Sequence, residues 1–119
     1  MAYGRKISGG RYHKQRKSKK YELHNPERHT LLGETKVKQL RIRGGSMKTI
    51  TLKTDIANVV VKGKIKQVKI TNVEETPANR FYARQNRLMK GAVITTEAGK
   101  ARITNRPGQE GQVNAVLVQ

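Results

Sequence analysis

The functional groups that stand out in this sequence are cationic side chains, and the function that they suit is the binding of polyanions. The 119 residues include 26 Lys or Arg against eight Asp or Glu, which gives a net charge of +18. A small domain needs a net charge of only about 2–8 to stay soluble, so this excess indicates a polyanionic partner. RNA, DNA and an anionic membrane surface are the candidate classes.

The densest cationic run lies at the N-terminus. Residues 1–20 contain no acid and eight basic side chains, which are Arg5, Lys6, Arg11, Lys14, Arg16, Lys17, Lys19 and Lys20. Neutralised phosphates release counterions, so such a segment gains affinity without a fixed fold. Thirty extended residues would reach about 100 Å, far enough to pass between nucleic-acid helices. A solvated charge run or a nuclear-localisation-like patch is the alternative that the composition leaves open.

Tyr3, Tyr12 and Tyr21 are interleaved with these charges. A tyrosine ring can stack on an unpaired base, which contributes about 1–3 kcal/mol per base. Unpaired bases are common in RNA and absent from duplex DNA, so the tyrosines favour RNA. The alternative, that Tyr21 packs with Leu23 against the folded part of the chain, remains open.

A second cationic group follows further along the chain. Strand alternation would place Arg41 and Arg43 on one face, with Lys48 nearby. The glycine pair Gly44-Gly45 could allow a phosphate to approach the backbone, could form a β-bulge, or could do both. The remaining candidate RNA contacts are the arginines of residues 77–90 and of the C-terminal region, namely Arg80, Arg84, Arg87, Arg102 and Arg106.

Catalytic and metal sites find no support in the sequence. The phosphate-binding pattern G-x-x-x-x-G-K-[ST] is absent, since Ala101 stands where it requires Ser or Thr. His13, His24 and His29 share no ligand spacing, and the chain has no cysteine to join them. We therefore predict no enzymatic activity, no cofactor and no bound metal.

The sequence also argues against a membrane partner. No apolar run approaches the roughly 18 residues of a spanning helix, and no stretch combines a basic face with an apolar one. The N-terminus lacks the apolar segment of a secretory signal. Together with the absence of cysteine, this agrees with an intracellular, cytoplasmic protein.

From residue 35 onward the composition is that of a β protein. Residues 35–119 hold ten Val, seven Ile and nine Thr, types that suit a pleated, half-buried surface. Turn signals divide this region into expected strands at 37–43, 48–54, 56–61, 65–73, 92–96, 100–105 and 112–118, with hairpin turns at Ala98-Gly99 and Pro107-Gly108. Residues 77–90 lack alternation and predict a short helical turn after Pro77.

The predicted fold is all-β, a small closed or partly open β-barrel of about six strands with a long basic N-terminal extension. Phe81 is the only Phe and there is no Trp, so the core must be small and aliphatic. We expect residues 1–30 to form an extension that is disordered when free, and residues 31–119 to form an RNA-binding barrel. Because so small a barrel is marginally stable alone, the partner should supply part of its order.

Several of these segments together resemble the ribosomal protein S8e family of the archaeal and eukaryotic small ribosomal subunit. The matching stretches cover most of the chain and are residues 8–11, 16–23, 41–45, 90–94, 101–109 and 111–117. The chain is similar to the short archaeal members, which lack the large insertion of the eukaryotic ones. It departs from the family at His24-Asn25, where Gly-Arg is common, so an arginine–phosphate contact at this point is not carried over.

The resemblance implies a small β-barrel that binds and stabilises small-subunit rRNA as a structural, non-catalytic constituent. It further implies a monomer within the cytoplasmic ribosome, beside other small-subunit ribosomal proteins. Matching basic positions are Arg5, Arg11, Arg16, Lys17, Lys19, Lys20, Arg41, Arg43, Arg102 and Arg106. An RNA-binding assembly factor and an architectural DNA-binding protein are the alternatives.

Overall fold

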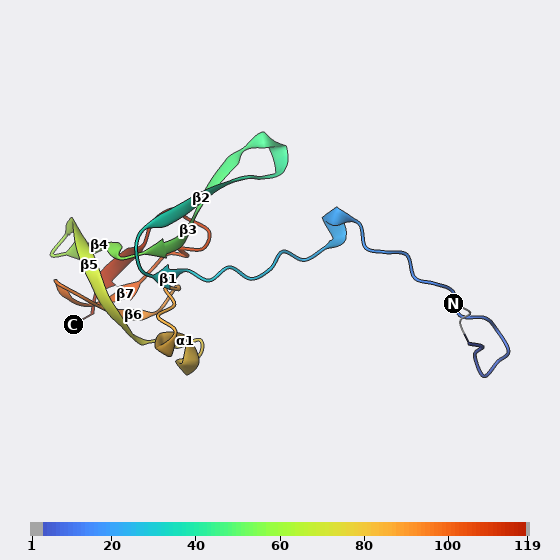
Figure 1. The fold of residues 1–119 in the computed structure, drawn as a ribbon. Coiled ribbons are helices and arrows are strands. Elements are labelled where there is room, and N and C mark those ends of the chain that lie inside the picture. The colour runs from blue at the N-terminus through green and yellow to red at the C-terminus, as the bar shows by residue number, and fades with distance from the viewer. Residues whose placement is uncertain (1–3, 119) are drawn as a thin grey trace.

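A computed structural model describes residues 4–118, which form a five-stranded β-barrel and a separate three-stranded sheet (Figure 1). The sheet has the order β1-β3-β2, and the barrel closes in the order β4-β5-β6-β7-β8. The sheet strands are β1 (Leu31–Leu32), β2 (Lys36–Arg41) and β3 (Met47–Thr54). The barrel strands are β4 (Ile56–Val61), β5 (Lys64–Glu75), β6 (Val93–Thr96), β7 (Gly99–Ile103) and β8 (Asn114–Leu117).

Consecutive barrel strands pair antiparallel, and β8 closes the barrel by pairing parallel to β4. Alternate side chains point inward, as the period of two requires. The core is aliphatic, as predicted, and its buried members are Ala57, Val59, Ile70, Val73, Leu88, Ala92, Ile94, Ala101, Ile103, Val113 and Ala115. Phe81, the only Phe, is half exposed and takes no part in the core.

The predicted all-β barrel is confirmed, but it has five strands and not about six, because the first two expected strands pair with each other outside it. β2 pairs antiparallel with β3, and only Leu40 in β2 is even partly buried. β2 carries charged side chains on both faces, such as Lys38 and Arg41. In a barrel, one of these faces would be buried in the apolar core, which is costly for an unpaired charge. No strand was predicted at β1, which pairs parallel with Lys53 and Thr54 at the end of β3.

The predicted helical turn after Pro77 is confirmed as α1 (Arg80–Arg84), between β5 and β6. Asn79 begins it, because its side-chain Oδ1 accepts a hydrogen bond of 3.0 Å from the backbone N–H of Phe81. A hairpin turn was predicted at Ala98-Gly99, and it lies one residue earlier, since Glu97 and Ala98 connect β6 to β7 and Gly99 begins β7. The connection through α1 leads into residues 87–90, a loop that carries basic residues.

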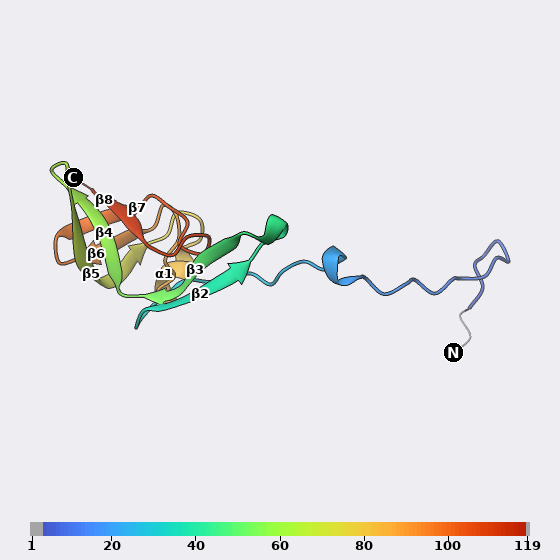
Figure 2. The same cartoon turned by 90° about the horizontal axis from the view of Figure 1, so that it is seen from above.

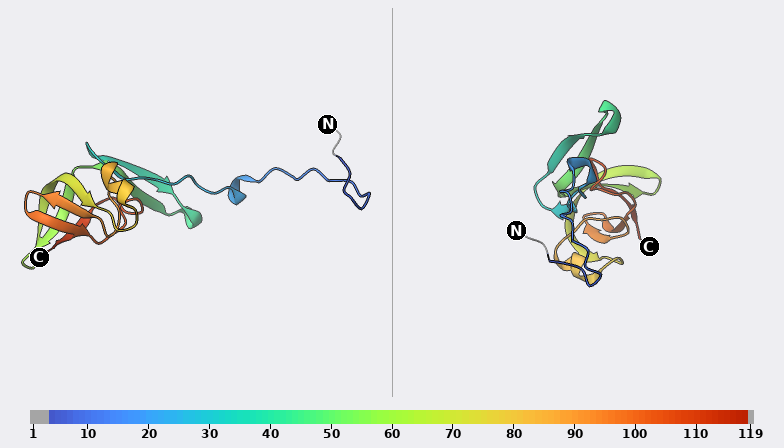
Figure 3. Two further views of the ribbon diagram at one scale, coloured as in Figure 1. Left: turned by 90° about the horizontal axis from the view of Figure 1, so that it is seen from below. Right: turned by 90° about the vertical axis from the view of Figure 1, so that its right-hand side faces the viewer.

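Residues 4–29 are exposed throughout and run away from the barrel as an extended segment (Figures 2 and 3). The segment contains one 3-10 turn, η1 (Lys20–Glu22), and a local bridge between Arg5 and Arg11. The β2–β3 hairpin leaves the barrel on the same side as this segment (Figure 2). Both elements therefore extend the reach of the molecule, whose principal-axis extents are 72 × 36 × 23 Å.

The loop between β7 and β8 packs closely on the β2–β3 sheet, and one glycine of the loop lies at a tight contact. A Cβ at Gly111 would lie 2.8 Å from Cγ2 of Thr49, whereas one at Gly108 would meet no atom closer than 3.8 Å. We expect Gly111→Ala to destabilise the protein by about 1–3 kcal/mol through overpacking, measured by chemical denaturation. Gly108→Ala, in the same loop, is the matched control and should be near neutral; equal stability of the two variants would contradict the packing argument.

Candidate nucleic-acid interface

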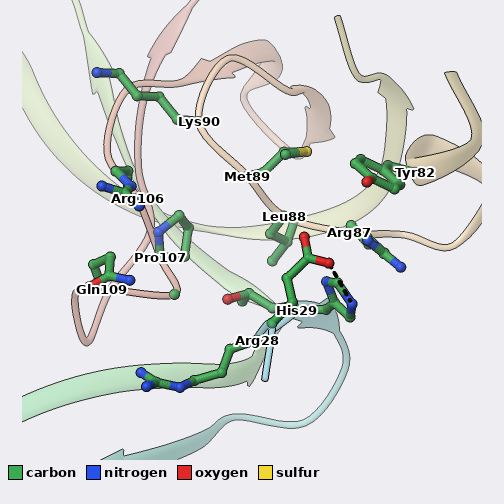
Figure 4. Close-up of a pocket in the computed structure, with 13 residues that line it drawn as sticks. Arg28, His29, Tyr82, Arg87, Leu88, Met89, Lys90, Arg106, Pro107 and Gln109 are labelled. Atoms are coloured by element: carbon green, nitrogen blue, oxygen red, sulfur yellow. Dashed lines mark ion pairs between the residues drawn. The ribbon is translucent and has the colours of Figure 1, made fainter. Parts of the chain in front are cut away.

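Three segments far apart in the sequence meet where the N-terminal segment joins the folded part. Residues 27–30, 87–90 and 106–109 line a common pocket, together with Tyr82 of α1 (Figure 4). The Leu88 N–H donates to the Thr30 carbonyl at 2.8 Å, and the Thr30 hydroxyl donates to the Thr51 carbonyl at 2.9 Å. The Thr51 N–H donates in turn to the Pro107 carbonyl at 3.1 Å. These bonds fix the pocket to β3.

The pocket has a volume of about 210 Å³ and an apolar floor. Leu88 and Pro107 are buried, and Met89 is partly buried beside them. Figure 4 shows Tyr82, Arg87 and His29 on one side of this floor and Arg106 and Gln109 on the other. The arrangement joins an apolar base to polar and cationic walls, which is the usual composition of a ligand site.

Positive charge dominates the rim. Arg28, Arg87, Lys90 and Arg106 all line the pocket. Glu27 is the single acid among the lining residues, and its carboxylate lies 3.7 Å from Nε2 of His29. A cluster of this composition attracts anions, and arginine suits phosphate because its guanidinium can bind two oxygens at once.

The Tyr82 ring and the Arg87 guanidinium form a stack on one wall, with Cζ of Arg87 4.2 Å from the ring centroid. Stacking of this kind holds both planar groups in a fixed orientation. Arg87 also forms a β-bridge with Leu31, so the wall is attached to the start of the folded part. Planar groups of this type are the surfaces on which unpaired bases stack.

Two of the predicted RNA-contact residues, Arg87 and Arg106, meet at this pocket, and a third lies beside it. The Lys48 ammonium donates to Oε1 of Gln109, which lines the pocket. Sequence reasoning missed Arg28, Lys90, His29, Tyr82 and Gln109 as a group. Arg28 and Lys90 could have been suspected from charge alone, but no local pattern places them together.

Arg80 and Arg84 lie elsewhere, both close to the Phe81 ring of α1. Their guanidinium carbons are 5.1 and 5.9 Å from the ring centroid. The i, i+4 spacing brings the two arginines to neighbouring positions on the helix. They form a second, smaller cationic group with an exposed aromatic ring.

Arg41 and Arg43 do not share a strand face, so that prediction was wrong. β2 ends at Arg41, and Arg43 begins the 3-10 turn η2 (Arg43–Gly45). Gly44 and Gly45 have φ of 85° and 82°, values that favour glycine, and the Ile42 N–H donates to the Ser46 carbonyl at 2.8 Å. The glycine pair therefore forms the tip of the β2–β3 hairpin rather than a bulge, and both arginines are exposed there.

Arg102 lies on the outer face of β7, opposite Val93 and Val116, and is not brought to the pocket. Near it, the Lys100 ammonium lies 2.9 Å from the Glu74 carboxylate. The hydrogen bond from Lys100 lowers the pKa of Glu74, with a further contribution from the Thr95 hydroxyl. One of the two cations on this face of β7 is thus already paired.

The predicted contacts of the N-terminal segment are all exposed: Arg5, Lys6, Arg11, Lys14, Arg16, Lys17, Lys19, Lys20 and Tyr21. The Arg16 guanidinium binds both oxygens of Glu22, at 2.6 and 2.9 Å. This pair, followed by the Lys19 N–H, lowers the pKa of Glu22. The Lys6 ammonium lies 5.7 Å from the Tyr12 ring centroid.

The tyrosines of the segment do not pack against the barrel where they can be followed. Tyr21 is 79% exposed and Leu23 is also exposed, so the packing alternative for Tyr21 is not the arrangement adopted. Tyr12 is likewise exposed. Tyr3 lies outside the described residues.

Within residues 4–118, no helix is long and apolar enough to cross a membrane. In the same part of the chain, no cluster of three or more His, Asp or Glu side chains is placed to hold a metal ion.

Comparison with known proteins gives one consistent result. The family model for ribosomal protein S8e matches residues 2–118. The chain is 48% identical to the small ribosomal subunit protein eS8 of Methanocorpusculum labreanum, over 97% of this chain and 94% of the relative. It is 44% identical to the protein of that name from Haloarcula marismortui (97% and 94%) and 45% identical to the one from Nanoarchaeum equitans (97% and 92%). The chain belongs to the ribosomal protein S8e family.

Proposed function

We propose that this protein is a structural constituent of the small ribosomal subunit, which binds and stabilises small-subunit rRNA in the cytoplasm. Its family consists of structural ribosomal proteins and not of enzymes. The observation that carries the proposal is that Arg28, Arg87, Lys90 and Arg106, which come from three distant segments, all line one pocket at the junction with the extension. Phosphate groups are the anions that such a set of guanidinium and ammonium groups suits.

The two parts of the chain would contribute differently. Residues 1–30 form a basic extension whose last residue, Thr30, is buried and bonded to Leu88 and Thr51. The part of the extension before the pocket would be disordered when free and become ordered along phosphates in a crevice between rRNA helices. Residues 31–119 dock on the rRNA surface as a domain. The contacts of this domain are Arg41, Arg43, Lys48, Arg80, Arg84, Arg87, Arg102 and Arg106. Tyr21 would stack on an unpaired base, since its ring is exposed.

The protein would act as a monomer beside other small-subunit ribosomal proteins, with no turnover. Its role is to neutralise the charge of neighbouring rRNA helices and hold them together. The charge of +18 supports this, because a folded chain carrying it alone would repel itself.

Two measurements test the proposed function. In a competition at one fixed salt concentration, small-subunit rRNA should displace duplex DNA from the full-length protein; DNA winning would overturn the assignment to RNA. The protein should also be retained stoichiometrically in purified mature small subunits. Its loss on maturation would instead identify an assembly factor.

A further inference from the structure

The pocket at the junction combines features that a purely electrostatic contact does not need. A surface that only neutralises phosphates requires charge, yet this one forms a half-open recess of about 210 Å³ that Leu88, Met89 and Pro107 help to line. Leu88 and Pro107 are buried, so the floor is preformed. An apolar, preformed recess surrounded by cations predicts a ligand with two parts. One part is planar or apolar and enters the recess, and the other is an anion attached to it.

We propose that this pocket receives one unpaired RNA base, with the flanking phosphates held by the cationic rim. The proposal rests on the proposed function and adds a specific site to it. The base would stack on the wall formed by Tyr82 and Arg87, whose planar groups lie 4.2 Å apart. The phosphates on either side would meet Arg28, Lys90 and Arg106.

The size of the pocket supports a single base rather than a larger ligand. Sites for drug-sized molecules occupy about 300–1,000 Å³, and this one is smaller. One ring system can enter while the sugar and the phosphates remain at the rim, where the charges are. Base-paired RNA cannot present such a ring, so an unpaired nucleotide is required.

The Gln109 side chain, on the wall opposite the Tyr82–Arg87 stack, could form hydrogen bonds with the edge of a base. The Gln109 side-chain oxygen accepts from the Lys48 ammonium, which directs the amide N–H donors of Gln109 to other acceptors. Bases carry ring nitrogen and carbonyl acceptors on their exposed edges. An acidic peptide containing Phe could satisfy the charges, but a phenyl ring carries no hydrogen-bond acceptor in its plane.

The experiment compares two RNA probes with the full-length protein. One is a short RNA duplex with a single unpaired nucleotide, and the other is the same duplex fully paired. Stacking contributes about 1–3 kcal/mol per base, so the unpaired probe should bind about 5- to 150-fold more tightly, measured by fluorescence anisotropy at one salt concentration. Tyr82→Leu should reduce this ratio to nearly one while leaving the affinity for the paired duplex within about twofold.

Phe81→Leu is the matched control, because Phe81 is the neighbouring aromatic residue of α1 and does not line the pocket. It should keep the wild-type preference. Should Tyr82→Leu lower the melting temperature, a 4-thiouridine at the unpaired position of the probe gives a second readout with the unchanged protein. That nucleotide should cross-link to residues 82–90 or 106–109.

The outcomes separate this proposal from the proposed function. If the wild-type protein binds both RNA probes equally well, or if its preference survives Tyr82→Leu, the base pocket is wrong while rRNA binding stands. If neither RNA probe is bound, the proposed function itself fails. Displacement of the unpaired probe by a short acidic peptide containing Phe, at lower concentration than by the same probe unlabelled, would assign the pocket to a protein partner instead.

Discussion

Deletion of residues 1–20 is expected to flatten the plot of log K against log salt concentration, for binding to small-subunit rRNA, by about 4–5 units. The segment carries eight cationic side chains and no acid. Arg16 is held by Glu22, which leaves seven, and we expect about six of these to meet phosphates, each contributing roughly 0.7–0.9 to the slope. Between about 50 and 200 mM salt, the full-length protein should therefore lose about 10²–10³-fold more affinity than the truncated one.

The measurement is a salt titration of binding with the full-length and truncated proteins. A variant with Tyr12→Leu and Tyr21→Leu keeps every charge, so its slope should match that of the wild type even where its affinity is lower. An unchanged slope after the deletion would identify the segment as a solvated charge run. Because residues 4–29 are exposed throughout, the truncated protein should keep its β spectrum in circular dichroism.

Local pattern predicted the strands well because their signals are local. The expected strand at 56–61 has the observed bounds of β4, since buried Ala57 and Val59 alternate with more exposed neighbours and Lys62-Gly63 forms the turn. The same pattern could not assign a strand to a sheet. β2 reads as a strand in sequence, but its charged faces exclude it from the barrel interior, and only long-range pairing decides where it goes.

The sequence predicted which kinds of charged residue would form the candidate site, but it did not predict where in the fold they would meet. Arg87 and Arg106 were recognised by type, but Arg28 and Tyr82 join them only because Thr30 hydrogen-bonds to Leu88 and Thr51. Such contacts depend on tertiary structure and produce no periodic pattern in the sequence. Arg43 illustrates the opposite error, because alternation was extended one residue past the end of the strand into a turn set by two glycines with positive φ.

Replacing Ile94 with alanine is expected to destabilise the protein by about 2–5 kcal/mol, because the deleted groups leave a cavity. Ile94 is fully buried on β6, where it pairs with Ala101 of β7 and Val73 of β5. Proteins of this kind have unfolding free energies of about 5–15 kcal/mol, and a core without large aromatic rings belongs at the low end. The Ile94→Ala protein should therefore be partly unfolded, measured by urea denaturation of the full-length chain.

Val60→Ala is the matched control, because Val60 also lies on a barrel strand, β4, but is 36% exposed. It should change stability by no more than about 0.5 kcal/mol, and Ile94→Val should fall between the two, at about 0.5–1.5 kcal/mol. Equal stability of the Ile94→Ala and Val60→Ala proteins would contradict the placement of Ile94 at the centre of the core.

The same variant tests whether the partner supplies part of the order. A ligand that binds only the folded state stabilises it by about 2.7 kcal/mol at a concentration 100 times its dissociation constant. That is comparable with the cost of Ile94→Ala, so saturating small-subunit rRNA should restore the β spectrum of the variant, whereas duplex DNA at the same salt concentration should restore less. Equal recovery with both nucleic acids would mean that charge alone orders the barrel, and that the pocket and the exposed tyrosines contribute nothing to the choice of RNA.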